Sequence, residues 1–142
     1  MAELGKHLAY LRAEHEAAQR APLSARKALL VAMLVDAYAD RLFAAQAAED
    51  DILAFREQLA AEVPALRLVF DVAAARARLV TEAVEVPIEA YDRLSVQDFM
   101  VSLYNGHTVQ RVRIVAADGT RHDAHGVLAE AVEALAVLSA LA

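Results

Sequence analysis

Two aspartates one helical turn apart are the first residues of this sequence that could carry out chemistry. Asp36 and Asp40 follow an apolar run at residues 28–35, and residues four apart share one face of a helix. Two neighbouring carboxylates can share a proton or hold a divalent cation. Because two acids are too few to enclose a cation, we favour surface positions or pairing with an arginine. Asp36, Asp40 and the adjacent Arg41 are kept as candidate binding residues.

A second group of possible ligands lies at residues 122–125. His122 and His125 supply two imidazoles and Asp123 a carboxylate, all of which zinc accepts. Residues three apart on a strand face opposite sides, so the two rings diverge unless the strand ends between them. His107 could add a ligand only if the hairpin register allows it. We favour structural roles, with Asp123 in a turn or cap, and keep His122 and His125 as alternative metal ligands.

Arginines recur in the segments that the sequence predicts to be strands. A guanidinium group pairs with carboxylate or phosphate through two hydrogen bonds, so Arg111 and Arg113 on one sheet face could bind a small anionic ligand. The favoured alternative is cross-strand ion pairing with Asp71, Glu82 and Glu85. The arginines assigned to predicted strands are Arg67, Arg76, Arg78, Arg111, Arg113 and Arg121.

Several kinds of site are excluded by residues that the chain lacks. The sequence has no cysteine, which rules out disulfides, thiolate zinc sites and cysteine nucleophiles. It has no glycine-rich phosphate loop, no serine-centred nucleophile elbow and no HExxH run. Four glycines in all leave little room for such a loop. The sequence therefore predicts no cofactor, and we assign no catalytic residue.

Charge and hydropathy narrow the expected partners and location. The net charge of −6 argues against a nucleic-acid partner, which needs a basic surface, and against an anionic membrane surface. No apolar run approaches the roughly 18 residues of a membrane span, and the N-terminus lacks the apolar core of a signal peptide. We expect a cytoplasmic protein whose 142 residues form a single domain.

Three helices are predicted before any strand. The first repeats apolar residues every three or four positions, with His15 on the same stripe as a partly buried, hydrogen-bonded side chain. Pro22 ends it, and Ser24 is a natural N-cap for the second helix. A break before the third is favoured over one continuous helix, because acidic residues at 49–51 suit a new helix N-terminus. The predicted ranges are 4–19, 25–45 and 51–62.

The middle of the chain is predicted to form a β-hairpin. Residues 77–86 are rich in β-branched side chains and stop before Pro87, which indicates a strand. Residues 66–73 alternate apolar and other side chains and are predicted to be its partner. The same residues also satisfy a helix with Pro64 in its first turn, so this segment is open between strand and helix.

The last part of the chain carries clear local signals. Ser95 and Asp98 resemble a capping box, which favours a short helix over residues 96–104. This helix would stop at Asn105 and Gly106, although the same dipeptide could instead turn a hairpin. Beyond it, a hairpin through Asp118 and Gly119 and a final helix are predicted over 108–116, 120–124 and 127–141.

Together these segments predict an α+β fold with three N-terminal helices, an antiparallel sheet of two hairpins with a short helix between them, and a C-terminal helix. The hydrophobic fraction of 58% exceeds the usual ~45–50%, although 34 alanines account for most of the excess. Residues 28–35 are apolar on every face, and residues 135–142 carry no charge. Both features suit packing against another element or a second copy.

We therefore expect a non-enzymatic homo-oligomer, most simply a homodimer, that binds a partner protein or a small anionic ligand. The alternative is a small metal-dependent or acid/base enzyme that uses Asp36 and Asp40, or His122 and His125.

Overall fold

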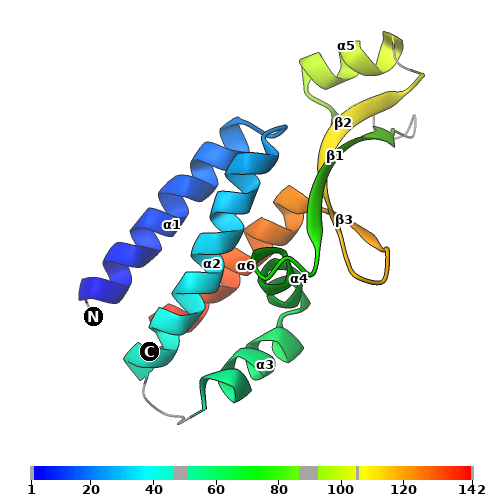
Figure 1. Ribbon diagram of the computed structural model, residues 1–142. Coiled ribbons are helices and arrows are strands. Elements are labelled where there is room, and N and C mark those ends of the chain that lie inside the picture. The colour runs from blue at the N-terminus through cyan, green and yellow to red at the C-terminus, as the bar shows by residue number, and fades with distance from the viewer. Residues whose placement is uncertain (1, 47–50, 87–92, 105, 142) are drawn as a thin grey trace.

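The chain folds into a helical body with a small antiparallel sheet at one side (Figure 1). The computed structural model describes residues 2–46, 51–86, 93–104 and 106–141. Within them, the predicted α+β class is confirmed. The elements in chain order are α1 (Ala2–Arg20), α2 (Ala25–Gln46), α3 (Ile52–Glu62), α4 (Pro64–Ala73), β1 (Arg78–Glu85), α5 (Val96–Tyr104), β2 (Thr108–Val115), β3 (Arg121–Asp123) and α6 (Ala124–Ala140).

Helix α2 forms the centre of the helical body and packs against α1, α4 and α6. Its buried residues recur every three or four positions, as expected for one face of a helix. Tyr38 is buried on this face, and its hydroxyl group is hydrogen-bonded to the hydroxyl of Ser139 on α6, so the buried polar atom has a partner. The buried residues of α2 are Ala28, Val31, Ala32, Val35, Tyr38, Ala39 and Leu42.

Side-chain caps start the helices where the sequence indicated. The hydroxyl oxygens of Ser24 and Ser95 accept hydrogen bonds from the backbone N–H groups of Lys27 (3.2 Å) and Asp98 (3.1 Å). Asp123 accepts from the N–H of Gly126 at 2.9 Å and caps α6. These bonds satisfy N–H groups that the helix itself leaves without partners. The predicted helix over residues 96–104 is confirmed as α5. Residues 49, 50, 87 and 105, on which other predicted signals fell, lie outside the described residues.

The predicted strand over residues 66–73 is wrong, because this segment forms helix α4. Pro64 occupies the first helical turn, where its missing N–H costs nothing. Leu66, Val69 and Phe70 then lie on one helical face and are buried. The burial of this face outweighs the alternating pattern that suggested a strand. The first predicted hairpin is therefore also wrong, and four helices precede the sheet instead of three.

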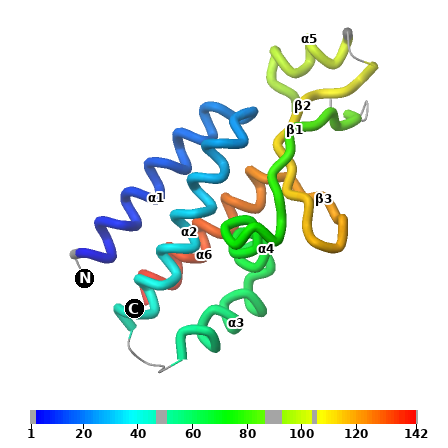
Figure 2. Tube along the Cα trace, viewed as in Figure 1, coloured from blue at the N-terminus to red at the C-terminus, as the bar shows by residue number. Residues whose placement is uncertain are grey.

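Strand β1 pairs instead with β2, in the sheet order β1-β2-β3. The antiparallel register runs from Arg78 opposite Val115 to Glu85 opposite Thr108. The second predicted hairpin, between β2 and β3, is confirmed, and Gly119 takes a φ of 86° in its turn. Figures 1 and 2 show the β1–β2 pair extending from the helical body, with α5 at its far end.

The C-terminal helix α6 is docked along part of its length. Leu128, Val132 and Leu135 are buried against the other helices, whereas Val137 and Leu141 are exposed. In the described part of the chain, no helix is both long and apolar enough to cross a membrane.

Candidate functional site

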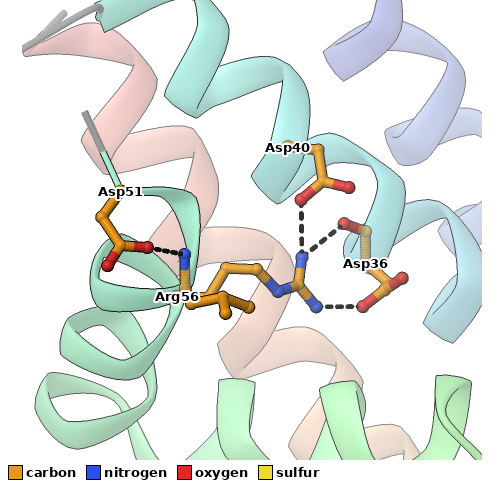
Figure 3. Close-up of polar contacts among 5 residues, drawn as sticks. Asp36, Asp40, Asp51 and Arg56 are labelled. Atoms are coloured by element: carbon orange, nitrogen blue, oxygen red, sulfur yellow. Dashed lines mark hydrogen bonds and ion pairs between the residues drawn. The ribbon is translucent and has the colours of Figure 1, made fainter. Parts of the chain in front are cut away.

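Asp36 and Asp40 converge on Arg56, which reaches them from α3 (Figure 3). The Nη1 atom of Arg56 donates to a carboxylate oxygen of Asp40 at 3.0 Å and to the backbone carbonyl of Asp36 at 3.1 Å. Its Nη2 atom donates to the Asp36 carboxylate. The two acids thus hold a protein cation, in agreement with the favoured interpretation of arginine pairing.

Arg56 is held on a second side by an aromatic ring. Its guanidinium carbon lies 4.2 Å from the ring centre of Phe70 on α4, a distance suited to a cation–π interaction. Asp51 positions α3 for this contact, because its carboxylate accepts from the N–H of Leu53 at 2.9 Å and caps the helix. The cluster therefore joins α2, α3 and α4. Its chemistry is that of a structural ion pair.

Arg41 lies apart from this cluster. It is exposed and borders a shallow hollow of about 280 Å³ between α1 and α2, together with Glu3 and His7. A neighbouring hollow of about 250 Å³ lies between Arg41 and Tyr10. The three candidate residues of α2 therefore do not form one site: Asp36 and Asp40 bind Arg56, whereas Arg41 lies at the hollows beside α1.

Two of the four arginines on the described strands pair with acids. Arg121 pairs with Glu82 at 3.0 Å, which confirms cross-strand pairing for that acid. Arg111 pairs instead with Asp98 of α5, also at 3.0 Å. Arg67 lies on α4, where it pairs with Glu57 at 2.6 Å; this ion pair raises its pKa.

Arg113 forms no ion pair with any residue that the structure describes. Within the described residues its buried Nε atom has no hydrogen-bond partner, and it sits opposite Asp123 and Val80 in the ladder. Arg111 and Arg113 share a sheet face, since they are two residues apart on β2. However, Asp98 already neutralises Arg111, so the pair does not offer two open guanidinium groups to one anion.

The two candidate histidines do not meet. His125 lines a polar hollow of about 390 Å³ with Arg111, Asp98 and Asp123, and its Nε2 atom is hydrogen-bonded to the carbonyl of Pro22 at 2.9 Å. His122 lies in another hollow, of about 630 Å³. There its Nε2 atom is 3.0 Å from the hydroxyl of Thr120. Over residues 2–46, 51–86, 93–104 and 106–141, no group of three or more potential ligands could hold a metal ion.

Burial holds the pKa of His15 below its ordinary value. Electrostatic interactions with His125 and Arg12 lower the pKa of His15 further, whereas Glu16 raises it. The lowered pKa keeps this imidazole neutral at neutral pH. His15 lies on the predicted stripe of α1, and its Nε2 atom is buried without a partner among the described residues.

An uncharged apolar surface on α2 is a feature that the polar candidates leave aside. Leu29, Leu30 and Met33 are 40%, 42% and 54% exposed, and Ala37 extends the same face by one turn. We call these four residues the α2 surface. The sequence indicated a helix that is apolar all round, but not which face the other helices would leave open.

Comparisons with protein-family models, with curated proteins and with solved structures give no match.

Proposed function

We propose that this chain is a non-enzymatic protein-interaction module that forms a homodimer through the α2 surface. The observation that carries the proposal is the exposure of Leu29, Leu30 and Met33 side by side on one helix. Large apolar side chains scattered singly on a surface need no explanation, whereas contiguous ones favour association. The opposite face of α2 is already packed, so a partner is the remaining means of covering this one.

The charges at the ends of the α2 surface favour a second copy in antiparallel orientation. Arg26, Met33 and Asp40 are spaced by seven residues, or two helical turns, so they share a face. In a twofold pair centred on Met33, Arg26 of each copy faces Asp40 of the other. Arg26 is exposed and has no ion pair with any described residue. The Asp40 side chain is 54% exposed while it binds Arg56, so it can accept a second cation.

The catalytic alternative has less support. Asp36 and Asp40 are engaged by Arg56, and His122 and His125 line separate hollows. General acid–base or metal chemistry needs such groups to converge on one substrate position. The arrangement of these candidates favours structural roles.

Light scattering coupled to size-exclusion chromatography tests the proposal at low micromolar concentration. The unaltered chain is expected to elute with twice the monomer mass. Met33→Glu places a charge at the centre of the interface and is expected to give a folded monomer, since Met33 is exposed and its replacement leaves the core intact.

The matched control is Leu53→Glu, which changes another exposed apolar residue outside the α2 surface and is expected to leave the dimer intact. Circular dichroism verifies the fold of both variants. A monomeric unaltered chain, or a Met33→Glu variant that stays dimeric, would contradict the proposal.

A further inference from the structure

A second surface lies between α6 and the corner where α3 meets α4. It is an open groove of about 480 Å³ with an apolar floor formed by Val63, Ala134, Val137 and Leu138. Val137 is 52% exposed. The floor therefore offers aliphatic surface to a partner without any rearrangement of the helices. We call this feature the α6 groove.

The rim of the α6 groove is entirely acidic. It carries Glu62 from the end of α3 and Glu130 and Glu133 from α6. Glu62 accepts a hydrogen bond from the amide of Gln58 at 3.1 Å, but none of the three carboxylates pairs with a basic side chain in the part of the chain that the structure describes. Three uncompensated negative charges thus surround an apolar floor.

We propose that the α6 groove binds an amphipathic helical segment of another protein, one with an aliphatic face flanked by lysine or arginine. Grooves between helices bind such segments through apolar anchors spaced three or four residues apart. Positive charges beside the anchors would pair with the rim carboxylates, which steers association and selects the partner. A segment flanked by acidic residues would be repelled.

Charge complementarity argues against a second copy of this chain as the occupant. The chain carries a net charge of −6, and two α6 grooves placed face to face would bring six carboxylates together. Leu29, Leu30, Met33 and Ala37 of the α2 surface are uncharged, and the arginines at its ends, Arg26 and Arg41, are accompanied by Asp40 on the same side of the helix, so this surface lacks the purely basic flanks that the rim would favour. The inference is thus independent of the dimer proposed above.

Isothermal titration calorimetry with a synthetic helical peptide tests this inference. The probe is an amphipathic peptide of leucine and lysine with leucines at positions i, i+3, i+4 and i+7, measured at about 0.15 M salt, where weak surface attraction is screened. We expect one peptide to bind per chain. The combined variant Glu130→Lys/Glu133→Lys is expected to weaken binding by about tenfold or more, and Val137→Glu by a similar factor.

Two controls separate groove binding from general attraction to an acidic protein. A scrambled peptide of the same composition keeps the charge and loses the apolar face, so it is expected to bind at least about tenfold more weakly. Met33→Glu, which alters only the α2 surface, is expected to bind the peptide as the unaltered chain does. Loss of the dimer in this variant with intact peptide binding would separate the two proposals.

Three outcomes would overturn the inference. The first is equal binding of the ordered and scrambled peptides, and the second is unchanged affinity in the Glu130→Lys/Glu133→Lys variant. The third is conversion of a dimer into monomers by Val137→Glu in light scattering, which would place a second copy of the chain in the groove.

Discussion

Arg56 lies between Asp36 and Asp40, where the sequence alone also allows a divalent cation to bind. Its guanidinium group donates to both carboxylates and to one carbonyl, and it lies over Phe70. The Arg56 side chain is 21% exposed, and those of Asp36 and Asp40 are 36% and 54% exposed. This partial burial places the cluster between a surface ion pair of little consequence and a buried pair that is costly to break.

Removing the guanidinium group should measurably destabilise the fold. We expect Arg56→Ala to lower the free energy of unfolding by about 1–2 kcal/mol, because it removes charged hydrogen bonds and a cation–π contact while leaving two acids together. Urea denaturation followed by circular dichroism measures the change. Glu57→Gln is the control, since it weakens the exposed pair with Arg67 and should cost less than about 0.5 kcal/mol. An equal decrease in the free energy of unfolding in the two variants would show that the Arg56 cluster stabilises the fold no more than an exposed ion pair does.

At the scale of elements, the end of α4 determines how the helical body passes into the sheet. Arg76 N–H donates to the carbonyl of Asp71 at 2.8 Å, and Ala75 N–H to that of Val72 at 3.1 Å. These two bonds form a Schellman motif, which normally places glycine at the left-handed position. Here that position is Ala75, with a φ of 62°. Its side chain makes this conformation unfavourable.

Replacing this alanine by glycine should stabilise the protein. The left-handed conformation costs an L-residue about 1–2 kcal/mol, and the greater freedom of glycine in the unfolded chain offsets part of the gain. We expect Ala75→Gly to raise the free energy of unfolding by about 0.5–1 kcal/mol in urea denaturation. Ala74→Gly is the matched control, because its φ is −87° and glycine there should destabilise by a similar amount. A loss of stability in Ala75→Gly would contradict this account.

Helix α4, which ends next to Ala75, shows why one element could not be predicted from the sequence. Local sequence signals were sufficient to predict where helices begin: Ser24, Ser95 and Asp123 each cap the helix that follows them. The segment 66–73 lacked a glycine stop, and its alternating residues fitted both structures. Burial of Leu66 in the core favours the helix over the strand. This burial depends on helices distant in the sequence, so the local pattern of residues 66–73 does not predict it.

The candidate site shows the same limit of local information. The acidic pair on α2 was visible as a spacing of four, and pairing with an arginine was the favoured interpretation. The partner itself, Arg56, lies 16 and 20 residues further along the chain on another helix. Which face of α2 remains open likewise depends on where α1, α4 and α6 pack, and so only the folded chain defines the α2 surface.

At the scale of the whole molecule, the two proposed surfaces can be occupied together. The packed face of α2 is the one that contacts α6, so the α2 surface points away from that helix. The two surfaces also differ in chemistry. The four residues of the α2 surface are uncharged, whereas the α6 groove is ringed by Glu62, Glu130 and Glu133. A dimer formed through the first would therefore present two copies of the second, and a partner with two basic segments could bind both at once.

The proposed antiparallel orientation of the two α2 helices can be tested by disulfide cross-linking. The chain has no cysteine, so each variant carries a single thiol at a chosen position. In an antiparallel pair centred on Met33, position 33 meets its own copy, while the two copies of position 26 lie about 21 Å apart along the helix axis. A disulfide needs Cα atoms within about 7 Å. Under mild oxidation, we expect Met33→Cys to form a covalent dimer on non-reducing gels, and Arg26→Cys and the control Leu53→Cys to remain single chains. Cross-linking of Arg26→Cys as efficient as that of Met33→Cys would instead indicate parallel helices, because only that arrangement brings every position on the shared face close to its own copy.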